Sequence, residues 1–164
     1  MSNFGRQLSA SETQWLLLDR VGNVNFVMIG ELEATTPEHV RSALDAVQRR
    51  HPLLRVRVVD QGGALWFRSG GVRSIPLRVE TAQGEGWIPE VEREMNTTLP
   101  AEEGPLARAV LLRSQDGAKL LITLHHAIAD GRSGMALLRE VARAVAAEAV
   151  GRPLDLPPID PAGP

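Results

Sequence analysis

Residues 120–131 read LLITLHHAIADG, and this run constrains the architecture more than any other segment of the chain. Residues 119–124 are nearly all apolar after the opening lysine. A strand that is apolar on both faces is typical of the middle of a sheet. A short loop follows, and Gly131 supplies the backbone freedom that a tight turn needs. We therefore expect a central strand over residues 119–124 whose end carries a loop, the place where rigid scaffolds often hold reactive groups.

The clearest helix is expected after this loop, over residues 134–150, where apolar residues recur at helical spacing and Ser133 is placed to cap the first turn. Thr36 and Pro37 are typical of the start of another helix, which Pro52 ends. Ser9 and Glu12 have the spacing of a capping box. Further strands are expected over residues 24–32, 53–59, 64–68, 75–79 and 105–112, and a further helix over residues 87–96. This pattern predicts an α/β two-layer sandwich with a mixed sheet and helices packed on one face.

Composition excludes several classes of function. The chain has 164 residues, enough for one domain, and a formal net charge of -2, so it lacks the basic field that holds a nucleic-acid backbone or an anionic membrane. It contains no cysteine, which excludes disulfides, thiolate metal sites and a cysteine nucleophile. The opening residues have no apolar core of a secretory signal, and no apolar run is long enough to span a bilayer. We expect a soluble, cytoplasmic domain without a nucleic-acid partner or membrane span.

The last segment, residues 152–164, has five prolines and no periodicity. Such a composition is typical of a linker. Residues 1–151 are therefore predicted to form one folded lobe, with a Pro-rich linker leading to a further lobe that this chain lacks.

The adjacent His125 and His126 are the strongest candidates for chemistry. Successive strand residues face opposite sides, so one imidazole is expected to be structural and the other free to face a substrate. An imidazole titrates near neutral pH, which suits general acid–base catalysis. A metal site built from His125, His126 and Asp130 is disfavoured, because the two histidines diverge and no accompanying ligand pattern exists. Trp15, Trp66 and Trp87 are interpreted as core or edge aromatics without a function.

Four segments carry a resemblance to a known family. Residues 125–131, HHAIADG, match the His-His-x-x-x-Asp-Gly signature of the chloramphenicol-acetyltransferase-like superfamily. Residues 50–55, RHPLLR, resemble the Arg-His-x-x-Leu-Arg segment of nonribosomal peptide synthetase condensation domains, and residues 104–108, GPLAR, resemble their Gly-Pro-Leu-x-Arg strand start. The opening, residues 6–12, is most similar to the polyketide-associated acyltransferases, typified by phthiocerol dimycocerosyl transferase. The chain thus resembles the N-terminal lobe of such an enzyme.

The resemblance implies an acyltransferase in which His126 deprotonates a hydroxyl or amine acceptor, which attacks a thioester on coenzyme A or on a carrier-protein phosphopantetheine arm. It implies no permanently bound cofactor and no metal. His125, Asp130 and Gly131 would support the site, and Arg55 is the expected partner of the Asp130 carboxylate. The implied partners are a second acyltransferase lobe, an acyl or peptidyl carrier protein and a small-molecule acceptor.

Two other functions remain open. One is a non-catalytic half-domain that binds a carrier protein or has a regulatory role. Such a half-domain would not need an intact His126, Asp130 and Gly131. A small homo-oligomeric enzyme would require neighbouring subunits to complete each site. The second lobe of the family carries an Asp-Phe-Gly-Trp-Gly-like segment, and this sequence contains nothing similar.

Overall fold

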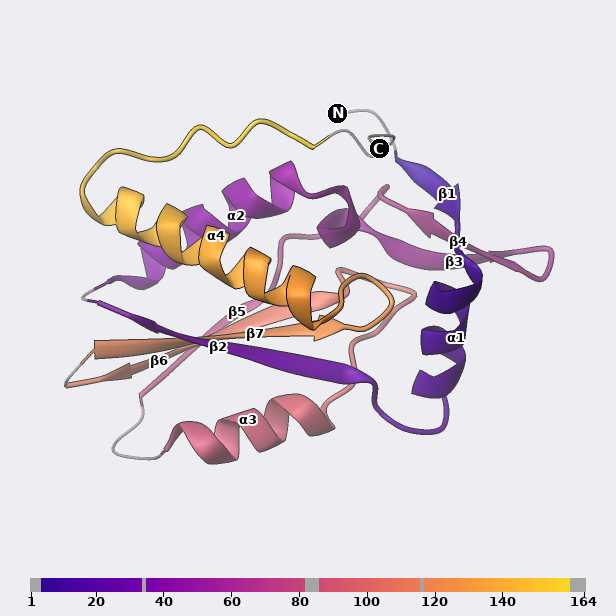
Figure 1. Cartoon of the computed structure of the whole chain (residues 1–164), viewed down its shortest axis with the longest axis horizontal. Helices are drawn as coiled ribbons and strands as arrows, with labels where there is room; N and C mark the ends of the chain where they lie inside the picture. The colour runs from indigo at the N-terminus through magenta and orange to yellow at the C-terminus, as the bar shows by residue number, and fades with distance from the viewer. Residues whose placement is uncertain (1–3, 34, 82–85, 116, 160–164) are drawn as a thin grey trace.

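The computed structural model describes residues 4–33, 35–81, 86–115 and 117–159. Within these ranges the chain forms two sheets with helices around them (Figure 1). In chain order the elements are β1 (Gly5–Gln7), α1 (Ala10–Asp19), β2 (Asn25–Leu32), α2 (Pro37–Arg50), the 3-10 turn η1 (Pro52–Arg55), β3 (Arg57–Gln61), β4 (Ala64–Arg68), β5 (Leu77–Thr81), α3 (Trp87–Asn96), β6 (Ala107–Ser114), β7 (Gly117–His125) and α4 (Gly131–Ala149).

Strand β7 lies inside the four-stranded sheet, whose order is β2-β7-β6-β5. It pairs antiparallel with β2, where Asn25 lies opposite His125, and antiparallel with β6. β5 joins β6 in parallel, so the sheet is mixed. Leu120, Leu121 and Leu124 have no exposed surface. The predicted central position of this strand and its burial on both faces are therefore confirmed.

Helices cover both faces of this sheet. Figure 1 shows α2 and α4 above one face and α3 below the other. Leu120 and Ile122 pack in the cluster that α2 and α4 share, whereas Leu121 packs in a cluster with Trp87 and Val91 of α3. The α/β class and the mixed sheet are confirmed, but the expected packing of helices on one face is corrected to both. The physical reason is that a strand apolar on both faces needs cover on both sides.

A buried carboxylate anchors α3 to the sheet. Glu94 is 3% exposed and accepts a hydrogen bond from the Thr123 hydroxyl at 2.6 Å and another from the Arg108 guanidinium. Burial tends to raise the pKa of Glu94, but the hydrogen bonds from Thr123 and Arg108 outweigh it and hold that pKa below its usual value. Arg108 also donates to the carbonyl of Thr97 at 2.6 Å. The arginine of the GPLAR segment thus ties β6 to the last turn of α3.

The smaller sheet has the order β1-β4-β3. β3 and β4 form a hairpin, and Gly62 and Gly63 at its turn both have positive φ. The strand predicted over residues 53–59 is wrong in its first half, where η1 precedes β3. Pro52 explains the difference, because its fixed φ and missing N–H favour the start of a tight helical turn.

Helix α1 begins at the predicted capping box. The Glu12 N–H donates to the Ser9 side chain, and the Glu12 carboxylate accepts from the Ser9 N–H. Arg6 pairs with the same carboxylate at 2.6 Å. Leu16 on the inner face joins Leu8 in the core cluster between α1 and the smaller sheet. These contacts fix α1 at the end of the molecule toward which β7 points (Figure 1).

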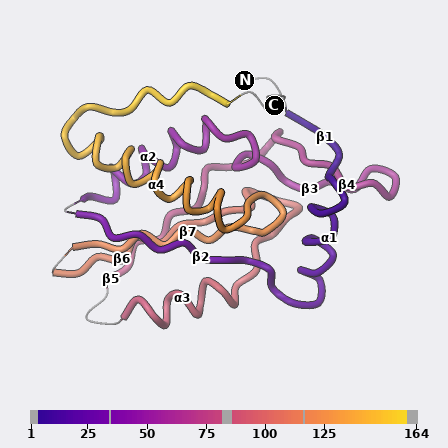
Figure 2. Tube along the Cα trace, viewed as in Figure 1, coloured from indigo at the N-terminus to yellow at the C-terminus, as the bar shows by residue number. Residues whose placement is uncertain are grey.

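The described part of the tail, residues 152–159, forms neither helix nor strand. It runs back alongside α2, as the tube in Figure 2 shows. Arg50 donates to the carbonyl of Pro157 at 2.7 Å and accepts from the N–H of Ile159 at 2.8 Å. The irregular backbone agrees with the lack of periodicity in this proline-rich segment. Its role as a linker to another lobe stays a prediction.

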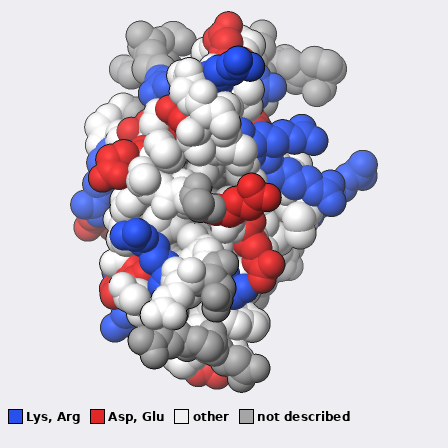
Figure 3. Space-filling model, turned by 90° about the vertical axis from the view of Figure 1, so that its left-hand side faces the viewer, with Lys and Arg blue, Asp and Glu red and all other residues white. Residues whose placement is uncertain are grey.

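No helix in the described ranges is long and apolar enough to cross a membrane. On the end of the molecule shown in Figure 3, acidic and basic side chains are intermingled. This distribution agrees with the small net charge of -2.

Candidate active site

The candidate site lies where β7 ends in the histidine pair. His125 is the last residue of the strand and has no exposed surface. Its Nδ1 accepts a hydrogen bond from the backbone N–H of Ala127 at 3.0 Å, so this nitrogen carries no proton and the imidazole is neutral. Its Nε2 faces the Asp19 carboxylate at 3.7 Å. Burial lowers the pKa of His125 below its ordinary value, and Asp19 opposes this effect only in part.

His126 is partly exposed, and its imidazole contacts two aromatic side chains. The Trp15 ring of α1 stacks on it, with centroids 4.4 Å apart and planes 16° apart. The Phe26 ring of β2 lies 4.6 Å away at an angle of 44°. The two histidines therefore have different environments, as the alternation of strand side chains predicts. Of the two histidines, only His126 has exposed surface.

Asp130 caps the helix that follows the loop. Its side chain accepts from the backbone N–H of Ser133 at 2.7 Å, and this hydrogen bond lowers the pKa of the Asp130 carboxyl. The expected N-cap, Ser133, is therefore corrected to Asp130, and α4 begins at Gly131 rather than at residue 134. The helix starts earlier because a carboxylate accepts readily from the free N–H groups of a first turn.

The Asp130 carboxylate is exposed rather than buried. Arg55, its expected partner, is partly buried on η1, and a pairing between the two side chains stays a prediction. Gly131 occupies the first position of α4, and a Cβ there would meet no atom within 4 Å. Its φ does not fall in the left-handed region, so the expected need for glycine flexibility in this turn is wrong. A residue that starts a helix has ordinary helical dihedrals.

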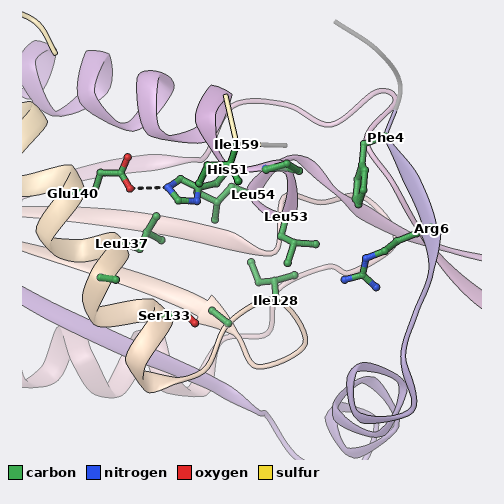
Figure 4. Close-up of a pocket in the computed structure, with 13 residues that line it drawn as sticks. Phe4, Arg6, His51, Leu53, Leu54, Ile128, Ser133, Leu137, Glu140 and Ile159 are labelled. Atoms are coloured by element: carbon green, nitrogen blue, oxygen red, sulfur yellow. Dashed lines mark hydrogen bonds and ion pairs between the residues drawn. The ribbon is translucent and has the colours of Figure 1, made fainter. Parts of the chain in front are cut away.

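A cavity of about 440 Å³ lies beside the loop (Figure 4). Ile128 and Ala129 of the loop line it, but His126 does not. At the far end, the Glu140 carboxylate of α4 pairs with His51 at 2.7 Å and with Arg50 at 2.8 Å. Most of the remaining wall is apolar. Its members come from β1 and the residue before it, η1, α4 and the tail: Phe4, Pro52, Leu53, Leu54, Ala136, Leu137 and Ile159, with Arg6 and Ser133.

Three side chains at the histidine pair were not assigned to the site from the sequence: Trp15, Asp19 and Phe26. The sequence suggests a core or edge aromatic without a function at Trp15, yet its ring stacks on His126. These residues lie about 100 positions before the pair, and no local motif connects them to it. Trp15 and Asp19 are one helical turn apart, which is the only sequence signal that places them on a common face.

Comparison with known proteins gives consistent matches. The condensation-domain family model matches residues 23–161. Chondramide synthase cmdD of Chondromyces crocatus is 35% identical over 133 residues, and surfactin synthase subunit 1 of Bacillus subtilis (strain 168) is 28% identical over 123 residues. The matches cover 77% and 71% of this chain, respectively, but only 3% of either synthase. The similarity of residues 6–12 to the polyketide-associated branch stays a prediction.

Solved structures share the fold. The starter condensation domain of rhizomide synthetase RzmA superposes with a TM-score of 0.79 at 21% identity, covering 93% of this chain and 40% of that one. The epimerization domain from the third module of tyrocidine synthetase B gives a TM-score of 0.74 at 20% identity, covering 95% of this chain and 38% of that one. The described fold is thus that of the N-terminal lobe of a chloramphenicol-acetyltransferase-like domain. With the family model matched from residue 23 to residue 161, this chain belongs to the condensation-domain family.

Proposed function

We propose that His126 is the general base of a condensation-type acyl transfer, from a coenzyme A or carrier-protein thioester to a hydroxyl or amine acceptor. The observation that carries the proposal is the unequal environment of the histidine pair at the end of β7. His125 is fully buried and engaged by the backbone, whereas His126 is partly exposed. Membership of the condensation-domain family supports an acyl transfer at this position.

The proposed reaction needs no covalent enzyme intermediate. The neutral imidazole of His126 takes a proton from the acceptor as its oxygen or nitrogen attacks the thioester carbonyl. A C–O or C–N bond forms, the C–S bond breaks, and the thiolate leaves. The proton held on His126 then passes to that sulfur, so that an ester or amide and a free thiol are the products. The absence of cysteine from the sequence is compatible with this direct transfer.

A thioester donor is supported by one of the structural neighbours. A starter condensation domain of rhizomide synthetase has been solved in complex with C8-CoA and Leu-SNAC. By analogy, we propose a thioester on coenzyme A or on a carrier protein as the donor for this chain. No permanently bound cofactor takes part in the proposed chemistry.

We further propose that residues 1–151 act together with a second lobe, joined through residues 152–164. The chain spans 40% of the solved rhizomide starter domain, and His126 lies outside the cavity of about 440 Å³ beside its loop. A base on one wall aligns donor and acceptor poorly without a facing wall, and such alignment supplies about 7–11 kcal/mol of a reaction barrier. His125, Asp130 and Arg55 are proposed to support the loop that carries the base, and Gly131 to start the helix that follows it.

A thioester-consumption assay tests the proposal, with wild-type and His126→Ala forms of both this chain and a two-lobed protein that contains it. Loss of the base is expected to lower turnover of the two-lobed protein about 10²–10⁴-fold. The chain by itself is expected to show little turnover even with His126 present. Equal turnover by the two-lobed wild type and its variant would remove His126 from the mechanism and favour a non-catalytic, carrier-binding half-domain. Strong His126-dependent turnover by the chain alone would instead favour a site completed within an oligomer.

A further inference from the structure

Helix α1 contacts both members of the histidine pair from a single face. Trp15 stacks on the imidazole of His126, with ring centroids 4.4 Å apart. Asp19, one turn further along the helix, faces Nε2 of His125 at 3.7 Å. Residues four positions apart lie on the same side of a helix, so a single placement of α1 satisfies both contacts.

We propose that Trp15 is a positioning residue for His126 and that α1 holds the imidazoles of His125 and His126 in place. The proposal rests on the proposed function, because it assigns Trp15 a role in the chemistry of His126. A partly exposed imidazole can rotate about two side-chain bonds. The nearly parallel indole, whose plane is only 16° from that of the imidazole, restricts this rotation by covering a face of the ring. Proton abstraction needs a base nitrogen within about 2.6–3.2 Å of the acceptor. The orientation of the imidazole ring decides whether its nitrogen reaches that distance.

Asp19 fixes α1 relative to β2 and β7. One oxygen of its carboxylate accepts from the backbone N–H of Val24 at 3.2 Å, next to the start of β2. The other oxygen faces His125, whose Nδ1 is already occupied by the Ala127 N–H. The proton of the neutral imidazole is therefore on Nε2, whose 3.7 Å contact with the carboxylate is electrostatic and too long for a hydrogen bond. The end of α1 is thus linked to the same strand end that displays His126.

Phe26 supplies a second aromatic contact, and the close approach of α4 limits where its ring can go. A Cβ built at Gly134 would lie 2.7 Å from Cε2 of Phe26 and 3.1 Å from Cε of Met28. Any side chain at Gly134 would therefore displace the Phe26 ring, which is 4.6 Å from His126. This gives a second, independent way to disturb the surroundings of His126 without changing α1.

A structural test uses the 164-residue chain and the ring proton resonances of His126, assigned by their loss in His126→Ala. Stacking on an indole shifts such resonances upfield. Trp15→Leu is expected to move them toward the positions of an unstacked histidine, and Trp15→Phe to retain most of the shift. Gly134→Ala is expected to move them as well, through Phe26. Gln14→Ala, an exposed change on the same helix, is the matched control and is expected to leave them in place.

A kinetic test uses the two-lobed protein with the same variants. A misplaced base lowers kcat rather than substrate affinity, so Trp15→Leu is expected to lower kcat by about 10- to 100-fold with little change in KM. Trp15→Phe is expected to recover most of this loss, which a general defect in folding would not allow.

The two tests separate the proposals. Unmoved His126 resonances in a folded Trp15→Leu chain would overturn the positioning role, whatever the activity. If Trp15→Leu does not fold, Trp15→Met takes its place, and unmoved His126 resonances in a folded Trp15→Met chain would overturn the positioning role. Shifted resonances together with an active His126→Ala protein would leave the aromatic contact established but contradict the proposed function.

Discussion

Nδ1 of His125 accepts a hydrogen bond from the backbone N–H of Ala127, 3.0 Å away, at the point where β7 turns into the loop. The bond requires a neutral imidazole, because a protonated ring has no acceptor nitrogen. Since Ala127 directly follows His126, the first histidine of the pair orders the backbone around the second. His125 thus shapes the turn, and His126 is the partly exposed residue that the turn holds.

This relationship predicts a pH dependence of stability. Burial lowers the pKa of folded His125 below its ordinary value of 6.5, whereas the unfolded chain keeps that value. As the pH falls from about 6.5 toward the folded-state pKa, the unfolded state binds more protons, so the free energy of unfolding falls. The slope from this group reaches at most about 1.4 kcal/mol per pH unit. Denaturant unfolding between neutral pH and about pH 5 is expected to show a steeper slope for the wild type than for His125→Gln. Equal slopes would contradict a neutral, buried His125.

The cap of α4 predicts a modest effect at Asp130. Asp130→Ala removes the acceptor for the Ser133 N–H and is expected to lower the Tm by about 2–4 °C. Asp130→Asn keeps a side-chain acceptor and is expected to retain most of the stability. Thermal denaturation of the two variants checks this. A collapse of the fold in Asp130→Ala would contradict a capping role alone and would indicate an ion pair that the fold depends on.

Two glycines of the motif segments are expected to respond oppositely to alanine. Gly131→Ala adds a Cβ that meets no atom within 4 Å, at a helix start, and is expected to leave stability unchanged or slightly higher. Gly104 has φ of 62°, and a Cβ there would lie 2.5 Å from the carbonyl oxygen of Val56. Gly104→Ala is expected to cost at least about 1–3 kcal/mol. Denaturant midpoints of both variants measure the contrast. A severe loss of stability in Gly131→Ala would restore the requirement for glycine in this turn.

The buried carboxylate of α3 predicts a large effect. Glu94→Ala leaves the guanidinium groups of Arg108 and Arg78 without their shared acceptor and is expected to cost about 3–5 kcal/mol. Glu92→Ala, an exposed change on the same helix, is the control and is expected to change stability by no more than about 0.5 kcal/mol. Chemical denaturation measures both. Similar small losses in the two variants would mean that α3 is held by its apolar contacts alone.

Much of the secondary structure could be predicted from the sequence because it depends on residues that are close together in the chain. The apolar run at residues 119–124 placed β7 in the middle of its sheet, and the capping box at Ser9 and Glu12 placed the start of α1. The helix at residues 87–96 has the predicted limits. Alternation along β7 likewise distinguished the two histidines, because adjacent strand residues must face opposite sides.

Only the tertiary structure decided which distant residues meet at the site. Trp15, Asp19 and Phe26 reach the histidine pair because α1 and β2 pack beside the end of β7, and no spacing along the chain encodes that packing. The hydrogen bond that the Asp130 carboxylate accepts from the Ser133 N–H was likewise not predicted. The sequence by itself determined the strand, the loop and the two histidines, because these depend on local periodicity. The neighbours of those histidines depend on long-range contacts, which are determined only when the whole core is assembled.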